Sequence, residues 1–287
     1  MSDEQQPKSA KDTHYARLRR QHRDLKAATT GQIGQKRRPA RPAMEGSPAP
    51  EGLVRLYGLH TVRAALDNPA RRIRRMLVTK NALARLEIAD PHALPFPVEI
   101  VEPKAIDRET GSEAVHQGVM IEAEPLPARK LADLGESPLL LVLDQVTDPH
   151  NVGAILRSAV AFGAGALITT ARHSPQESGV LAKAASGALE MIPHIEVRNL
   201  AEALGELHAL GFTTIGLDSE GPVEMEAALA GTRIALVLGA EGKGLRQKTR
   251  ETVTTLARLD MPGAIKSLNV SNAAAISLYA VRRYLGQ

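Results

Sequence analysis

The chain has no cysteine and no tryptophan, and it holds only three phenylalanines and four tyrosines among its 287 residues. The absence of cysteine excludes disulfide bonds, a thiolate nucleophile and any zinc site built on cysteine. So few aromatic rings argue against a platform on which nucleic-acid bases stack. No apolar run approaches the roughly 20 residues of a membrane span, and no signal-peptide core opens the chain. We therefore expect a cytoplasmic protein with no membrane partner and no metal site.

The basic charge of the chain is concentrated at its N-terminus. The net charge is +4, but residues 1–50 carry 11 Lys and Arg against 5 Asp and Glu, so the other residues together are slightly acidic. Residues 1–52 are polar, rich in Gln, Arg and Pro, and lack apolar periodicity, which predicts a disordered basic tail. Such a tail is either a solvated extension or an arm that contacts an anion such as RNA phosphate.

Residues 53–126 have the pattern of a small α/β domain. Apolar spacing favours two helices and alternation favours three strands. We predict helices over 56–68 and 81–89, and strands over 73–79, 97–102 and 117–124. Residues 127–138 resemble a linker.

Five arginines gather around the first of these strands. They are Arg63, Arg71, Arg72, Arg74 and Arg75. Such a run is either the solvated flank of a strand or a grip on RNA phosphates, which the forked guanidinium binds well. We predict the second role for all five.

Residues 139–287 alternate apolar strands with helical segments. Strands that are almost continuously apolar, with helices between them, indicate a parallel sheet covered on both faces. We predict strands over 139–144, 165–170, 192–197, 212–218, 233–239 and 255–261, and helices over 152–163, 177–190, 199–211 and 271–285. The fold class is therefore α/β, with a parallel-sheet domain after a smaller α/β domain and a basic tail.

Ligands of parallel sheets bind beyond the carboxyl ends of the strands, so the loops after the strands are the places where chemistry is expected. In the loop over 144–157, Asn151 is placed to cap the following helix, and Arg157 lies off the apolar stripe of that helix. A cap and a surface arginine explain both residues without a catalytic role.

The loop over 236–246 has three glycines in six positions, which allow backbone amides to approach a ligand. It matches neither the phosphate-binding P-loop nor the dinucleotide fingerprint, which argues against a nucleotide-dependent oxidoreductase. Glu241 in this loop is expected at a helix N-terminus, where the dipole stabilises a carboxylate.

The loop over 259–275 bunches small polar side chains, among them Ser267, Asn269, Ser271 and Asn272. Capping of the last helix needs only one of them, and Ser271 is the predicted cap. The other polar side chains are not needed for capping and are consistent with a binding site.

Taken together, three segments resemble the SpoU family, the RNA 2′-O-ribose methyltransferases of the knotted SPOUT class. They read NVGAILRSAVAFGA, LVLGAEGKGLR and MPGAIKSLNVSNAAA. The N-terminal segments LYGLHTVRAAL and AVHQGVMIEAEP are similar to the substrate-binding domain of this family, which resembles ribosomal protein L30e. The resemblance covers residues 53–287 and is greatest to enzymes that methylate a guanosine ribose in 23S ribosomal RNA.

The resemblance implies a trefoil knot that binds S-adenosylmethionine (SAM). Gly239, Leu259 and Leu268 would line the cofactor pocket, with Met261 close by. The family usually has Ile-Pro-Met where this chain has Leu-Asp-Met, so Asp260 departs from the pattern.

The resemblance also implies a catalytic set and a homodimer. Arg157 would activate the ribose hydroxyl, and because a free guanidinium has a pKa above 12, we favour stabilisation of the alkoxide over a role as base. Asn151 and Glu241 would orient Arg157 or the ribose, and Ser267 and Asn269 would complete the site.

Two alternatives stay open at this point. The chain could be a non-catalytic RNA-binding factor in ribosome assembly, although all the expected site residues are present. It could also methylate transfer RNA, since related enzymes share the three motifs. The N-terminal domain favours 23S ribosomal RNA, alone or in an assembling large subunit.

Overall fold

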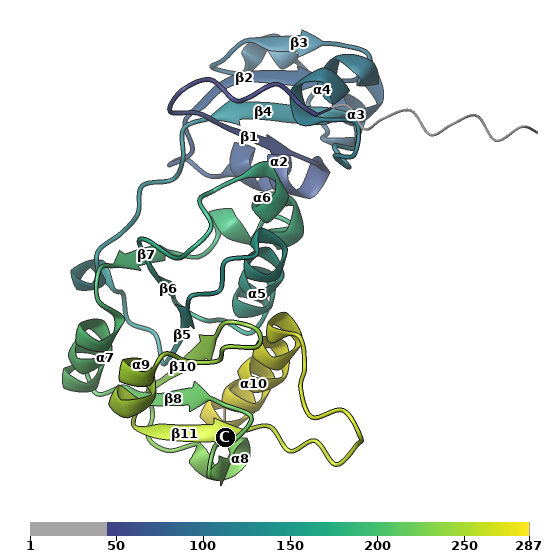
Figure 1. Cartoon of the computed structure of the whole chain (residues 1–287). Helices are drawn as coiled ribbons and strands as arrows, with labels where there is room; N and C mark the ends of the chain where they lie inside the picture. The colour runs from purple at the N-terminus through teal and green to yellow at the C-terminus, as the bar shows by residue number, and fades with distance from the viewer. Residues whose placement is uncertain (1–44, 287) are drawn as a thin grey trace, which may run out of the picture. The chain divides into compact units, whose positions relative to one another are not determined.

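The computed structural model describes residues 45–286, which belong to one compact unit and are drawn in colour in Figure 1. Most of the predicted tail therefore lies outside the described residues. Its last part does not behave as a free tail, because the Ser47 hydroxyl donates a hydrogen bond to the carbonyl oxygen of Arg108 at 3.0 Å. The ordered N-terminal domain thus begins before residue 53.

The N-terminal domain is built on a four-stranded sheet in the order β1-β4-β2-β3. β4 pairs antiparallel with both neighbours, and all five of its residues are buried. The elements are β1 (Val54–Tyr57), α2 (Leu59–Asp67), β2 (Ile73–Val78), α3 (Lys80–Arg85), β3 (Val98–Ile100), α4 (Pro103–Thr110) and β4 (Val119–Ala123).

Two elements of this domain differ from the prediction. The expected helix over 56–68 is divided by Gly58, whose φ of +93° ends β1 before α2 begins. Helix α4 was not predicted, because only one of its residues, Ile106, is fully buried and its sequence has no apolar stripe.

The C-terminal domain contains a seven-stranded parallel sheet in the order β7-β6-β5-β10-β8-β11-β9. All six predicted strands are confirmed. The strands are β5 (Leu139–Asp144), β6 (Leu167–Thr170), β7 (His194–Val197), β8 (Thr213–Leu217), β9 (Val223–Glu224), β10 (Ile234–Gly239) and β11 (Thr255–Arg258). The short edge strand β9 was not predicted.

Helices cover both faces of this sheet. They are α5 (Pro149–Ala161), α6 (Gly179–Ala185), α7 (Leu200–Ala209), α8 (Met225–Ala228), α9 (Gln247–Thr252) and α10 (Val270–Leu285). Helices α5, α6 and α10 lie on one face, and α7 and α9 lie on the other (Figure 1). No helix within residues 45–286 is long and apolar enough to cross a membrane.

Alternate residues of β5 point into two different cores. Leu139, Leu141 and Leu143 pack with α5, α6 and α10, whereas Leu140 and Val142 pack with α7 on the other face. This explains why β5 has no polar alternation, since both faces are covered. It also leaves only the ends of the strands free to hold polar groups.

The two domains contact each other through α6 of the C-terminal domain, which packs against β1 and α2. A Cβ on Gly179 would lie 2.3 Å from the Tyr57 ring and 2.5 Å from the carbonyl oxygen of Arg55, so no larger residue fits there. The Thr61 hydroxyl donates to the carbonyl oxygen of Ala182 at 3.1 Å. These contacts hold α6 against the N-terminal domain.

Candidate active site

A pocket of about 350 Å³ opens at the carboxyl edge of the large sheet. All four residues expected to bind the cofactor line it, and so do two of the expected catalytic residues. The six are Gly239, Glu241, Leu259, Met261, Ser267 and Leu268. The structure thus brings the second and third polar loops together around one cavity.

The glycine at the end of β10 is required by the close approach of its own loop. A Cβ on Gly239 would lie 2.1 Å from the carbonyl carbon of Gly244, which is backbone and cannot move aside. The amide of Gly244 donates to the carbonyl oxygen of Ala240 at 2.8 Å and closes the turn. The wall of the pocket is therefore a tightly folded backbone loop.

A hydrogen-bonded network beside the pocket joins three expected catalytic residues. The Asn151 side-chain amide donates to Oε1 of Glu241 at 3.3 Å, and the Asn269 amide donates to Oδ1 of Asn151 at 3.0 Å. Oε1 of Glu241 also accepts from the amide of Val270 at 3.1 Å. One carboxylate therefore ties α5 to the start of α10.

The structure corrects three details of these residues. Helix α5 starts at Pro149 and its cap is Asp148, which leaves Asn151 free for the network. The cap of α10 is Asn269, whose Oδ1 accepts from the amide of Ser271 at 2.8 Å, so Ser271 is not the cap. Glu241 does sit at a helix N-terminus, but the helix is α10 and not the one that follows Glu241 in the chain.

Arg157 is not part of this network. It is exposed on α5, and no hydrogen bond or ion pair joins it to another residue of the described chain. It lies about 9 Å along the helix axis and roughly 120° around it from Asn151, by the rise and turn of an α-helix. The guanidinium is therefore available to an anion.

Sequence reasoning missed two acidic residues at this edge of the sheet. Asp144, fully buried at the end of β5, accepts hydrogen bonds from the Arg246 amide at 3.0 Å and from its Nε at 2.7 Å. Asp218, after β8, lines the pocket and forms an ion pair with Arg250. Both acids follow strands at the carboxyl edge, and that position was the signal that could have found them.

Arg71 does not belong to an RNA-binding surface. Its side chain is completely buried and forms ion pairs with Glu177 at 2.5 Å and with Glu190 at 2.6 Å. The Arg71 guanidinium also donates to the carbonyl oxygen of Glu124 at 2.8 Å. A phosphate cannot reach this guanidinium, so its predicted RNA contact is replaced by a contact between the two domains.

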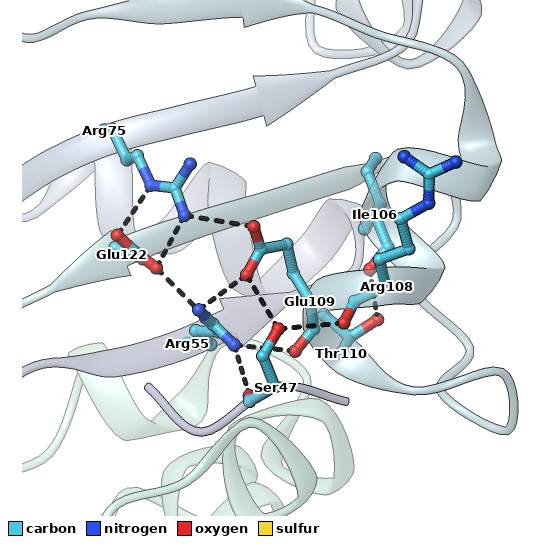
Figure 2. Close-up of polar contacts among 8 residues, drawn as sticks. All are labelled: Ser47, Arg55, Arg75, Ile106, Arg108, Glu109, Thr110 and Glu122. Carbon is cyan, nitrogen blue, oxygen red and sulfur yellow. Dashed lines mark hydrogen bonds and ion pairs between the residues drawn. The ribbon is translucent and has the colours of Figure 1, made fainter. Parts of the chain in front are cut away.

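Arg75 is largely occupied within its own domain. Figure 2 shows it in a closed ring of alternating charges with Glu122, Arg55 and Glu109. The Arg75 Nε lies 2.6 Å from the Glu122 carboxylate, and this hydrogen bond holds the pKa of Glu122 below its ordinary value although burial acts in the opposite direction. The ring balances its charges internally and offers little to RNA.

The other three arginines of the predicted cluster remain accessible. The side chains of Arg72 and Arg74 are 77% and 58% exposed, and both pair with Glu124. Arg63 on α2 is partly exposed and has no ion-pair partner among residues 45–286. These three stay candidates for RNA contact.

The sequence model of the "SpoU rRNA Methylase family" matches residues 138–279, and that of "RNA 2′-O ribose methyltransferase substrate binding" matches residues 55–128. Among curated relatives, a protein of Ralstonia nicotianae is 42% identical over 242 residues, which are 79% of this chain and 95% of that protein. One of Pseudomonas putida is 37% identical over 240 residues, covering 80% and 97%. Both are named 23S rRNA (guanosine-2′-O-)-methyltransferase RlmB.

Solved structures share the fold. A TrmH-family protein from Porphyromonas gingivalis superimposes with a TM-score of 0.68 at 27% identity and covers 82% of this chain and 91% of its own. The SpoU methyltransferase AviRb from Streptomyces viridochromogenes, in complex with AdoMet, has a TM-score of 0.69 at 23% identity and covers 81% and 90%.

Proposed function

Because the chain belongs to the SpoU rRNA methylase family, we propose that it transfers the methyl group of SAM to the 2′-hydroxyl of a guanosine in 23S ribosomal RNA. The observation that carries the proposal is the pocket at the carboxyl edge, beside which Glu241, Asn151 and Asn269 form a polar network. The relatives named for this reaction match both domains of the chain.

The pocket fits SAM in size and in chemistry. Its volume lies within the range of roughly 300–1,000 Å³ that is usual for small-molecule sites. Leucines and Met261 provide apolar walls for the adenine and the methionine chain, and the backbone of the loops after β10 and β11 provides hydrogen-bonding groups. Bound there, the sulfonium would supply an electrophilic methyl group.

The residues of this chain would act on the ribose. Arg157, which has no partner among residues 45–286, would stabilise the negative charge that develops on the 2′-oxygen as its proton passes to a water molecule or an RNA phosphate. The Glu241–Asn151–Asn269 network and Ser267 would hold the ribose in line with the methyl group. Correct alignment of two reactants is a large contribution by itself, on the order of several kcal/mol.

We propose that Arg157 serves the pocket of a second copy of the chain. Helix α5 runs away from the carboxyl edge, and Arg157 lies about 9 Å along it and roughly 120° around it from Asn151, outside the network of its own chain. The surface beside it is suited to self-association, because Ile276 and Tyr279 of α10 are about half exposed, and Phe162 lies against the Tyr279 ring. A symmetric dimer through this face would complete two sites.

We also propose the trefoil knot, the L30e-like character of the N-terminal domain and the disordered basic tail. The path of the last segment supports the knot, because the chain after β11 returns past the loop after β10 to place α10 against α5. The four-stranded sheet with helices between its strands supports the L30e-like character of the N-terminal domain. The excess of Lys and Arg before residue 45 supports the basic tail.

Methylation can be measured directly. Purified protein is incubated with labelled SAM and 23S ribosomal RNA, and positions that resist alkaline cleavage are mapped, because a 2′-O-methyl group confers that resistance. We expect label transfer to one guanosine. Transfer only to transfer RNA would favour the tRNA alternative. RNA binding without label transfer and without SAM binding by calorimetry would favour the assembly-factor alternative.

Mixing two inactive variants tests the shared site. Arg157→Ala lacks the arginine and Gly239→Ala has a weakened cofactor pocket, so at a SAM concentration near the wild-type Kd each homodimer should be nearly inactive. After random subunit exchange, half of the dimers are mixed and have one competent site in two, which predicts about a quarter of the wild-type rate. Failure of the mixture to recover activity would contradict a site shared between subunits.

A further inference from the structure

Two arginines that form no ion pair with residues 45–286 follow neighbouring strands at the carboxyl edge of the large sheet. Arg172 lies two residues after the end of β6, and Arg198 directly follows β7. The two strands are neighbours, Thr170 is paired with Val197, and the Ala171 amide donates to the carbonyl oxygen of Val197 at 3.0 Å. His173 adds a third exposed basic side chain.

These side chains are unusual in a domain that is otherwise acidic. Residues 131–287 carry 13 Lys and Arg against 16 Asp and Glu. Two other arginines at strands or strand ends of this domain are held by carboxylates, in the pairs Arg246–Asp144 and Arg258–Glu224. In contrast, Arg172, His173 and Arg198 have no ion pair or hydrogen bond with any residue between 45 and 286.

The nearest acidic residues do not neutralise them. Glu196 is two residues before Arg198 on the same face of β7, yet no ion pair joins them. Glu196 instead acts on the partly buried His194, opposing the desolvation that lowers the pKa of that histidine. Glu202, in the first turn of α7, accepts from the Asn199 side chain at 2.7 Å. The positive charge of Arg198 therefore faces solvent.

The register of the sheet aligns these arginines with the cofactor pocket. Gly239 at the end of β10 pairs with Asp144 at the end of β5. Leu143, one residue before Asp144, pairs with Thr169 of β6, so the next residue, Thr170, lies in the same row as Gly239. Thr170 in turn pairs with Val197 of β7. With strands about 4.8 Å apart, β6 and β7 lie about 10 and 14 Å from β10 along the same edge. An RNA strand that enters the pocket with one ribose would therefore pass over this row within a few nucleotides.

We propose that Arg172, His173 and Arg198 form a phosphate-binding shelf for the nucleotides that flank the methylated ribose. The proposal rests on the function proposed above and assigns part of the RNA grip to the catalytic domain itself. Two adjacent guanidinium forks suit successive phosphates, because each can donate two parallel hydrogen bonds. Contacts of this kind position the RNA without reading its bases.

The double variant Arg172→Ala/Arg198→Ala tests the shelf. We expect the KM for a 23S ribosomal RNA fragment to rise about tenfold, with kcat at saturating RNA and SAM binding retained. We also expect the slope of log K against log salt, measured by filter binding, to fall by about one for each phosphate that the variant no longer neutralises. The matched control is Arg282→Ala/Arg283→Ala, which removes two exposed arginines from the end of α10 in the same domain.

The outcomes separate the shelf from the function. If the wild type methylates RNA and the two double variants have equal KM values and equal salt slopes, the shelf is overturned. If the wild type binds RNA with the expected difference in salt slope but transfers no methyl group, the shelf stands and the proposed function fails. Absence of RNA binding by the wild type would overturn both.

Discussion

The guanidinium of Arg71 in the N-terminal domain lies 2.6 Å from the carboxylate of Glu190 in the C-terminal domain. Neither side chain has more than 2% of its surface exposed. The Asn68 amide donates to the same carboxylate at 2.7 Å, and Glu177 pairs with the other side of the guanidinium. One arginine thus holds two carboxylates of the other domain, and its charge cannot be removed without leaving them unpaired.

Replacing Arg71 should destabilise the protein strongly. Arg71→Met leaves Glu177 and Glu190 buried without a cation, and loss of one partner of a buried pair costs about 3–5 kcal/mol of unfolding free energy. Urea denaturation measures the change. The control is Arg72→Met, next in the chain, whose exposed side chain should contribute no more than about 1 kcal/mol. Equal effects of the two substitutions would contradict the role of Arg71.

The stability of the N-terminal domain should depend on pH through Glu122. Hydrogen bonding to Arg75, which outweighs the effect of burial, lowers the pKa of Glu122 below 4.5. A carboxyl group whose pKa is lower in the folded state than in the unfolded state stabilises the protein at pH values above its unfolded pKa. This stabilisation is lost as the pH falls through the folded pKa. Glu122→Gln should therefore lower the melting temperature at neutral pH.

The difference between wild type and Glu122→Gln should shrink as the pH falls below 4.5, where the wild-type carboxylate becomes protonated. Melting curves over this range check the prediction. At neutral pH the substitution should cost on the order of 2 kcal/mol, the usual contribution of a hydrogen bond to a charged group. A difference independent of pH would show that Glu122 acts through packing alone.

SAM binding should weaken when a methyl group is added to Gly239. Gly239→Ala forces the loop after β10 outward, because the new Cβ would overlap the backbone of Gly244. Overpacking of this kind costs about 1–3 kcal/mol, which predicts a Kd about five- to 150-fold weaker by calorimetry. Gly263→Ala, in the loop after β11, places its Cβ in open space and should bind normally.

Asn269 should affect both stability and turnover. Asn269→Ala removes the cap of α10, at a cost of about 1 kcal/mol, and also breaks the link to Asn151. We expect kcat to fall more than SAM affinity, since the network orients the ribose. Asn272→Ala changes the same residue type one turn later, where no side-chain hydrogen bond to residues 45–286 is formed. Similar turnover in both variants would argue against the network.

Much of the fold can be predicted from local sequence patterns. The strands of the large sheet were predicted because both faces are covered, which requires continuous apolar runs such as LLLVLD and IALVLG. The elements that were missed are short or poorly buried. β9 has two residues and α8 has four, and neither length produces a periodic signal.

The candidate site was only partly predictable for a different reason. Gly239 ends a strand and Leu259, Met261 and Leu268 stand in the loop after the next one, and that position is visible in sequence. The acidic partners of Arg71 are Glu177 and Glu190, which are 106 and 119 residues away in the sequence. Because sequence reasoning saw only the nearby arginines, it predicted that Arg71 belongs to an exposed run of charge. Asp148 rather than Asn151 caps α5 because Pro149 begins the helix, a preference that sequence reasoning could have used.

The contact between Asn151 and Asn269 spans 118 residues of sequence. During synthesis the first of these residues leaves the ribosome long before the second. The carboxylate of Glu241 has no amide of α10 to bind until Val270 has followed it. Contacts of such long sequence separation form late in folding. Competence for methylation therefore arrives only with the last helix, and a chain that ends before Val270 lacks the network around Glu241.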